Sequence, residues 1–298
     1  MSGRFLRGLL RGATRFTIKP LLGPGVPVRW QRRLLKLPES VTRTPRQIAV
    51  RKQPLGGVAG EWLGTPVAGD SPVILYLHGG GYCVGSTDSH RPITASLVKF
   101  TGCAVYSADY RLAPEHPHPA ALDDALAVYR ALLAAGHRRL ILAGDSAGAG
   151  LALATALALR DAGLAPPQAL LLLSPWADLS CSGATMQTQA AQDPMLSAGV
   201  LTRWAREYLG ALPPEHPACS PLFGELRGLP PVLIQVGRDE VLLDDSLRLQ
   251  QRLQQAGVPV QLQVFEGMWH DFHLHVGTLA EADQAFADID RYLRDVVG

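Results

Sequence analysis

The stretch "ILAGDSAGAGLALATALALR", residues 141–160, joins a short apolar run to an alanine-rich run through Gly-Asp-Ser-Ala-Gly. The first run has the length of a buried strand and the second that of a helix. A serine at the tip of a sharp strand-to-helix turn needs small neighbours, and Gly144 and Gly148 lie two positions either side of Ser146. Such a turn also directs the first N–H groups of the helix toward a developing negative charge. The pattern predicts a nucleophilic serine, with an ordinary helix N-cap at Asp145 or Ser146 as the alternative.

A glycine loop lies upstream of this turn. In "VILYLHGGGY", residues 73–82, His78 and three glycines directly follow an apolar run. Glycines let backbone N–H groups approach a ligand that side chains would exclude. We predict that the N–H groups of two of these glycines and of Ala147 together form an oxyanion hole. A flexible glycine loop is the alternative.

A histidine and two carboxylates lie downstream. His270 follows the apolar run 260–265, and Asp239 and Glu240 follow the run 232–236. The order serine, acid, histidine is the one expected for a catalytic triad on this kind of sheet. We therefore predict His270 as the general base and one of the two carboxylates as the triad acid.

Other histidines near His270 leave two alternatives open. His273 and His275 are rival bases, although they lie further into the loop. A metal site on His270, Asp271, His273 and His275 is the second alternative, although no His-Glu-x-x-His pattern accompanies them.

The order of apolar runs predicts the fold class. Nearly continuous apolar runs alternate with segments of helical spacing, as in an α/β fold with a mostly parallel sheet and helices on both faces. The expected strands are 73–77, 103–107, 140–143, 169–173, 232–236 and 260–265, and the expected helices are 120–135, 149–162, 244–256 and 281–297.

Two regions break this alternation. We predict that residues 1–45 form an N-terminal helical cap segment, and that residues 46–298 form the catalytic domain with a cap insertion at about 179–221. An insertion between two parallel strands can cover the crevice at their carboxyl ends, where such sheets bind ligands.

Composition limits the partners and the compartment. The 298 residues carry a net charge of +2 with both signs interspersed beyond the first 50 positions, which favours a small-molecule substrate and argues against nucleic acid. The four cysteines form no C-x-x-C pair, so we expect four free thiols and a cytoplasmic protein; they are Cys83, Cys103, Cys181 and Cys219. The expected strand 260–265 at a sheet edge favours a homodimer.

The N-terminus is basic and has no secretory h-region. Residues 1–33 carry seven arginines and one lysine, and arginine and glycine interrupt every apolar run. We interpret this segment as an amphipathic helix that covers part of the fold. A peripheral membrane contact is the second interpretation.

With these motifs in place, the chain resembles the bacterial hormone-sensitive-lipase-like esterases (family IV carboxylesterases) of the α/β-hydrolase superfamily. The resemblance covers about residue 73 to the C-terminus and rests on "HGGGY" (78–82), "DYRLAPEHPHPAALDD" (109–124), "GDSAGAG" (144–150), "SPW" (174–176), "DPML" (193–196) and "MWHDF" (268–272). It implies an α/β-hydrolase fold with a helical cap that shapes the acyl pocket. It also implies that Gly80, Gly81 and Ala147 supply the oxyanion-hole N–H groups.

The resemblance also helps to choose the triad acid. Related chains usually carry Asp-Pro-Leu-x-Asp after this strand, with the first Asp orienting the histidine. Counting back without gaps from the shared "AGV" at 256–258 puts the second Asp at Asp244 and the first at Glu240. Counting from Gly237 instead selects Asp239 but needs an inserted residue, which would rotate the apolar face of the helix by about 100°. Glu240 is our first choice and Asp239 the second.

The expected activity is acyl transfer from short- to medium-chain esters through an acyl-enzyme, with no metal or organic cofactor. We expect Tyr82, Trp204 and Met195 to contact the substrate. An amidase or a lactonase could use the same triad, and a non-catalytic receptor on this fold is a further alternative. Arg111 and Glu115 are expected to form an ion pair that braces the glycine loop.

Overall fold

The computed structural model describes residues 3–35 and 48–298. It contains an 8-stranded sheet in the order β1-β2-β4-β3-β5-β6-β7-β8. The strands are β1 (Val50–Lys52), β2 (Gly60–Leu63), β3 (Val73–Leu77), β4 (Ala104–Ala108), β5 (Leu140–Asp145), β6 (Ala169–Leu173), β7 (Val232–Gly237) and β8 (Val260–Phe265). Pairing is antiparallel between β1 and β2 and between β2 and β4, and parallel between all other neighbours. The prediction of a mostly parallel sheet is confirmed.

Strand β3 shows why the central runs are continuously apolar. All five of its residues are buried. Val73, Leu75 and Leu77 join one hydrophobic cluster, while Ile74 and Tyr76 join a second. Because successive side chains of a strand point to opposite faces, a strand covered on both sides needs apolar residues at every position.

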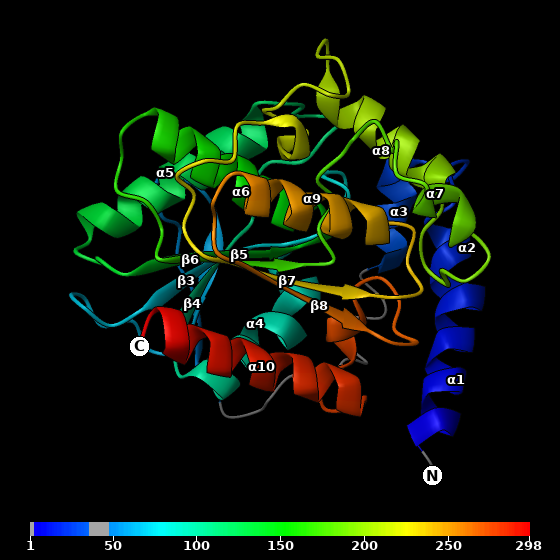
Figure 1. Cartoon of the computed structure of the whole chain (residues 1–298), viewed down its shortest axis with the longest axis horizontal. Coiled ribbons are helices and arrows are strands. Elements are labelled where there is room, and N and C mark those ends of the chain that lie inside the picture. The colour runs from blue at the N-terminus through cyan, green and yellow to red at the C-terminus, as the bar shows by residue number, and fades with distance from the viewer. Residues whose placement is uncertain (1–2, 36–47) are drawn as a thin grey trace.

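Helices cover both faces of the sheet (Figure 1). On one side lie α4 (Thr87–Thr101) and α10 (Ala280–Val296), and on the other lie α5 (Ala120–Ala134), α6 (Ser146–Asp161) and α9 (Leu243–Gln255). The four predicted helices are present. One boundary was wrong, because α6 begins at Ser146 and not at 149.

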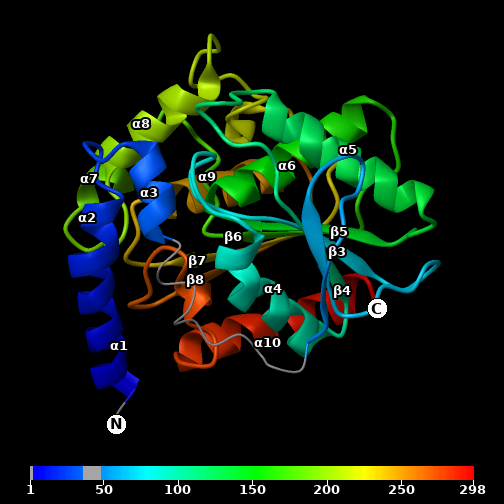
Figure 2. The same cartoon turned by 180° about the vertical axis from the view of Figure 1, so that it is seen from behind.

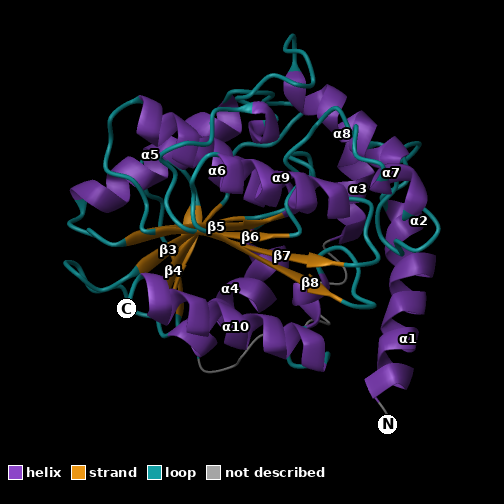
Figure 3. Cartoon of the chain, viewed as in Figure 1, coloured by secondary structure: helices purple, strands orange, loops and turns teal. Residues whose placement is uncertain are grey.

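The N-terminal segment and the long connection between β6 and β7 lie together. The N-terminal elements are α1 (Gly3–Ala13), a π-helical turn (Thr14–Ile18), α2 (Lys19–Leu21) and α3 (Val28–Leu35), and the connection carries α7 (Thr185–Thr188), α8 (Ala198–Leu209) and a 3-10 turn (Pro221–Phe223). Helices α2 and α3 lie beside α7 and α8 in both views (Figures 1 and 2), beyond the ends of β7 and β8 (Figure 3). Residues 36–45 of the predicted cap segment lie outside the described residues.

Basic side chains attach the N-terminal segment to the rest of the chain. Arg15 Nη2 donates to the carbonyl oxygen of Gln192 at 3.0 Å. Arg32 donates from Nε to the carbonyl oxygen of Cys83 and from Nη2 to that of Ala113, both at 2.7 Å. These bonds support the interpretation of this segment as a cover over part of the fold.

The predicted ion pair between Arg111 and Glu115 does not form. Arg111 Nη2 binds Asp124 Oδ1 of α5 at 2.7 Å, and Asp124 Oδ2 also accepts the backbone N–H of Arg111 at 2.8 Å. Glu115 Oε2 instead accepts from Arg32 at 2.7 Å. The prediction was wrong because the fold brings Asp124 of α5 to Arg111 and Arg32 of α3 to Glu115.

The four cysteines are free, as predicted. Within residues 3–35 and 48–298, no helix combines the length and the hydrophobicity that crossing a bilayer requires.

Candidate active site

The turn between β5 and α6 holds Ser146 in a strained conformation. Its φ is 53°, a left-handed value that non-glycine residues adopt rarely and at functional sites. A Cβ atom on Gly148 would collide with the carbonyl oxygen of Leu77, and one on Gly144 would collide with the carbonyl group of Gly148. The turn is therefore as crowded as the sequence predicted, and only glycine fits at these two positions.

Three buried side chains that follow three different strands form a hydrogen-bonded chain. Ser146 Oγ lies 2.9 Å from His270 Nε2, and His270 Nδ1 lies 2.8 Å from Glu240 Oε2. The other carboxylate oxygen, Glu240 Oε1, accepts from Ser174 Oγ at 2.9 Å and from the backbone N–H of Gly237 at 2.5 Å. Both carboxylate oxygens are thus fixed, and the imidazole is held between an acid and a hydroxyl.

Asp239, the second choice for the acid, lies elsewhere. Its Oδ2 is 2.5 Å from Arg11 Nη1 of α1, and its side chain is 22% exposed. This residue joins the N-terminal segment to the loop after β7 and makes no contact with the imidazole.

The charge state of His270 reflects two opposing effects. Burial lowers the pKa of His270, but the neighbouring carboxylates Asp271 and Glu240 outweigh it and raise that pKa well above its usual range. Asp271 Oδ2 is 3.1 Å from Nε2, the same nitrogen that contacts Ser146. The imidazolium that forms when Ser146 loses its proton would therefore be strongly stabilised.

The rival bases have other environments. His273 Nε2 lies 3.2 Å from Gln235 Oε1, and the ring of His275 packs edge-on against Trp269. Burial lowers the pKa of His273 to about 3 and that of His275 to about 4, so both are neutral at physiological pH.

Asp145 holds the glycine loop beside the serine. Its Oδ1 accepts from the backbone N–H of Gly79 at 2.9 Å and from the Tyr76 hydroxyl, and its Oδ2 lies 3.1 Å from His90 Nε2. Burial raises the pKa of Asp145, but His90 and the hydrogen bonds together hold it at about 2. The fixed charge of this buried group keeps Gly79 in place, next to Gly80 and Gly81.

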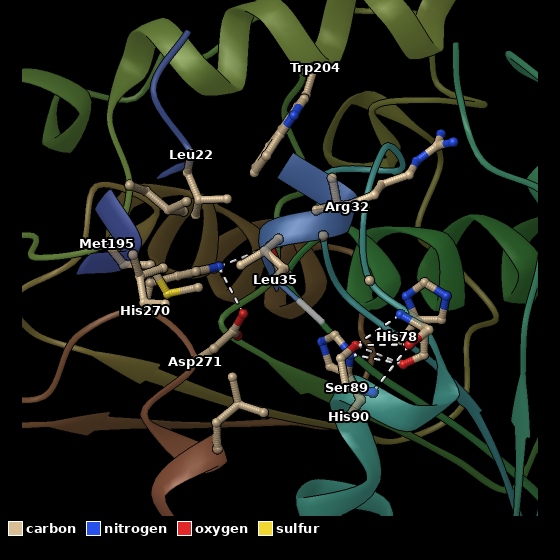
Figure 4. Close-up of a pocket in the computed structure, with 18 of the residues that line it drawn as sticks. Leu22, Arg32, Leu35, His78, Ser89, His90, Met195, Trp204, His270 and Asp271 are labelled. Atoms are coloured by element: carbon tan, nitrogen blue, oxygen red, sulfur yellow. Dashed lines mark hydrogen bonds and ion pairs between the residues drawn. The ribbon is translucent and has the colours of Figure 1, made fainter. Parts of the chain in front are cut away.

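A cavity of about 550 Å³ opens over Ser146 and His270 (Figure 4). One part of its wall is apolar and comes from the N-terminal segment and the connection between β6 and β7, with Ile18, Leu22, Leu35, Met195, Leu196 and Trp204. Another part is polar, with His78, Ser86, Ser89, His90, Asp109 and Asp271. Its size suits a small organic molecule with one apolar end.

Two of the three residues expected to contact substrate line this cavity. Trp204 and Met195 are in its wall, whereas Tyr82 is not and instead stacks on Tyr208 with ring centroids 3.7 Å apart. Gly81 lies directly beneath Trp204, because a Cβ atom there would collide with the indole.

Comparison with known proteins agrees with this geometry. A family described as having the alpha/beta hydrolase fold matches residues 74–274. The chain is 45% identical over 246 residues to an acetyl-hydrolase of Streptomyces hygroscopicus, covering 82% of each chain. It is 39% identical over 248 residues to an esterase of Acinetobacter venetianus, again covering 82% of each. A crystal structure of an esterase from the bacterial hormone-sensitive lipase family superposes with a TM-score of 0.90 at 39% identity, covering 97% of this chain and 98% of that one.

The chain belongs to the bacterial hormone-sensitive-lipase-like family of α/β-hydrolase esterases. This hormone-sensitive-lipase-like esterase is a carboxylic ester hydrolase, and its α/β-hydrolase fold confirms the prediction from sequence.

Several polar residues of this esterase's cavity were not predicted from sequence, among them His90 and Asp271. His90 lies on α4, a helix that the sequence analysis did not predict, and Asp271 was considered only as a metal ligand. The position of Asp271 directly after His270 was the available signal, because adjacent residues share one loop.

Proposed function

We propose that this esterase is a serine carboxylesterase that hydrolyses short- to medium-chain acyl esters through an acyl-enzyme. The observation that carries the proposal is the hydrogen-bonded chain from Ser146 through His270 to Glu240, with heavy-atom distances of 2.9 and 2.8 Å. Such a chain activates a hydroxyl that is otherwise a weak nucleophile.

The reaction proceeds in two halves. Ser146 Oγ attacks the ester carbonyl while His270 Nε2 takes its proton, and Glu240 keeps Nδ1 protonated and stabilises the imidazolium. The proton then passes from Nε2 to the leaving alcohol oxygen. Water, activated by the same nitrogen, attacks the acyl-enzyme and releases the acid.

The oxyanion is proposed to bind the N–H groups of Gly80, Gly81 and Ala147. Three observations support this assignment. The N–H of Gly79 is already bonded to Asp145, Gly80 lines the cavity, and Ala147 is the second residue of α6, whose N–H has no acceptor within the helix. Losing one such donor typically lowers the rate by about 10²- to 10³-fold.

The acyl chain is proposed to lie against the apolar wall formed by both cap regions. A cavity of about 550 Å³ must hold the alcohol part as well as the acyl part, which limits the acyl length. We expect acyl chains of about two to eight carbons to be preferred over long chains.

The test is a series of p-nitrophenyl esters of rising acyl length, run with wild type and Ser146→Ala beside an anilide and a lactone. We expect Ser146→Ala to lower kcat by several orders of magnitude with an unchanged melting temperature, and chelators to have no effect. Mass spectrometry of protein quenched during turnover should find one acyl group on the peptide that contains Ser146. Near wild-type turnover of Ser146→Ala would contradict the mechanism, and faster hydrolysis of the anilide or lactone would favour an amidase or a lactonase.

Three further interpretations of the sequence remain predictions. They are a cytoplasmic location, a homodimer and a peripheral membrane contact. Strand β8 does form an edge of the sheet, and the N-terminal segment does expose Phe5, Leu9 and Phe16. Light scattering tests for the homodimer, and sedimentation with anionic vesicles tests for the membrane contact.

A further inference from the structure

Asp271 carries a carboxylate oxygen that no group in the described residues satisfies. The residue is 4% exposed and lines the cavity (Figure 4). Its Oδ2 lies 3.1 Å from His270 Nε2, whereas its Oδ1 has no hydrogen-bond partner within residues 3–35 and 48–298. Buried carboxylate oxygens are normally paired, so the free one calls for an explanation.

The surroundings of Asp271 disfavour a purely structural role. Burial raises the pKa of Asp271 to about 6, against the attraction of His270. The backbone is also in the left-handed region, with a φ of 53°. Glycine or asparagine would adopt this conformation more easily and would bury no charge there. Both penalties are offset if a donor that arrives with the substrate pairs with the carboxylate.

The mechanism of ester hydrolysis determines which part of the substrate lies near Asp271. His270 must deliver a proton from Nε2 to the leaving alcohol oxygen, which therefore lies at about 3 Å from that nitrogen. Asp271 Oδ2 is 3.1 Å from the same nitrogen. The leaving oxygen and the carboxylate are consequently neighbours, and a donor on the next carbon of the alcohol is within reach of Oδ2.

The other charged groups near Asp271 have partners of their own, so its carboxylate is left as an acceptor. His90 and Asp145 lie close enough to influence Asp271, but they already pair with each other at 3.1 Å. Glu240 is occupied by Nδ1 of His270, by Ser174 and by Gly237. Asp109, another carboxylate of the wall, accepts from the N–H and the hydroxyl of Thr87.

We propose that Asp271 binds the leaving group, with its carboxylate, through the oxygen beside His270 Nε2, accepting a hydrogen bond from a hydroxyl or ammonium group on the carbon next to the scissile oxygen. The preferred substrates are then esters of short polyols or amino alcohols, with the acyl chain on the apolar wall. This inference rests on the proposed serine mechanism, because that mechanism fixes where the leaving oxygen lies.

The test compares 2-hydroxyethyl butyrate with 2-methoxyethyl butyrate, which share the acyl group and carry an oxygen at the same position of the alcohol, but only the first can donate a hydrogen bond from it. We expect wild-type kcat/KM to favour the hydroxyl ester by about tenfold or more, the typical effect of a hydrogen bond to a charged group. The ratio should approach one in Asp271→Ala and take an intermediate value in Asp271→Asn, which keeps one neutral acceptor. Asp109→Asn is the matched control and should keep the wild-type ratio.

The outcomes separate this inference from the mechanism on which it depends. Equal kcat/KM for the two esters in wild type would overturn the inference, whether or not the variants fold. A preference that survives in Asp271→Ala would overturn it as well. Failure of wild type to hydrolyse either ester would instead count against the proposed function.

Discussion

Asp193 Oδ2 accepts a hydrogen bond of 3.0 Å from the backbone N–H of Val241, the residue that follows Glu240. The other oxygen, Oδ1, accepts from the N–H groups of Met195 at 2.7 Å and Leu196 at 2.8 Å. One buried carboxylate in the connection between β6 and β7 thus fixes both an apolar wall of the cavity and the loop that carries the proposed triad acid.

Asp193→Asn should therefore weaken both stability and catalysis. The amide replaces one acceptor by a donor, so at least one backbone N–H loses its partner, which lowers the free energy of unfolding by about 1 to 3 kcal/mol. We also expect a lower kcat, because the Glu240 loop loses a support. Chemical denaturation and butyrate-ester kinetics measure the two effects. Gln192→Ala, in the exposed neighbour, is the control and should change stability by less than about 0.5 kcal/mol.

The two adjacent carboxylates after β7 should differ sharply on substitution. Glu240→Gln should lower kcat by about 10²- to 10⁴-fold, because the imidazole loses the group that orients it. Asp239→Asn should have little effect, since a partly exposed pair with Arg11 contributes little. Steady-state kinetics on one butyrate ester decides the ranking, and a larger loss in Asp239→Asn would contradict our assignment of the acid.

The pH dependence of kcat/KM should reveal the effect of Asp271, the second carboxylate beside His270. The base must be neutral, so kcat/KM rises as His270 loses its proton. Burial lowers the pKa of His270, but Asp271 and Glu240 raise it well above the usual 6.5, so the rising limb should lie above that pH. Asp271→Asn removes one negative charge, lowers the pKa of His270 and should move the limb to lower pH. Profiles from about pH 5 to about pH 9 measure this shift, and an unmoved limb would show that Asp271 does not act on the base.

Asp245 should make stability depend on pH. Its Oδ2 accepts the N–H groups of Ala177 at 2.8 Å and Asp178 at 2.9 Å, and burial, with the charge of Asp178, raises its pKa from 3.8 to about 8. Between these values the folded state holds a proton that the unfolded state has lost, so this group's contribution to stability falls as pH rises. Asp245→Asn removes that fall and should gain stability relative to wild type from pH 5 to pH 8. Melting temperatures at both ends check the sign, and a relative loss at the upper end would refute it.

Local sequence was sufficient to predict the central sheet and the sharp turn around Ser146. Strand β3 is apolar at every position because both its faces are covered. Gly144 and Gly148 are dictated by contacts within the turn and with β3, so their spacing around Ser146 marks the turn directly.

The elements that were missed lack a local signal. Strand β1 is exposed at all three positions and carries Arg51 and Lys52, so no apolar pattern marks it. Helix α4 contains Pro92 and buries polar residues such as Thr94 and Ser96, which hides its periodicity. Tertiary packing determines both elements.

The ion-pair partners of charged side chains could not be predicted from the sequence either. The choice of Asp124 for Arg111, or of Arg11 for Asp239, depends on which segments the fold brings together. The placement of Asp271 against the reacting nitrogen depends on a left-handed turn that the sequence does not specify.

The N-terminal segment is held mainly through main-chain atoms of its neighbours. Arg15 donates to the carbonyl oxygens of Ala191 and Gln192, and Arg32 to those of Cys83 and Ala113. A carbonyl oxygen is present whichever side chain occupies the position. Substitutions at these four positions therefore keep the acceptors that hold the N-terminal segment. Side chains around the proposed acyl site can thus change during evolution while the segment stays attached.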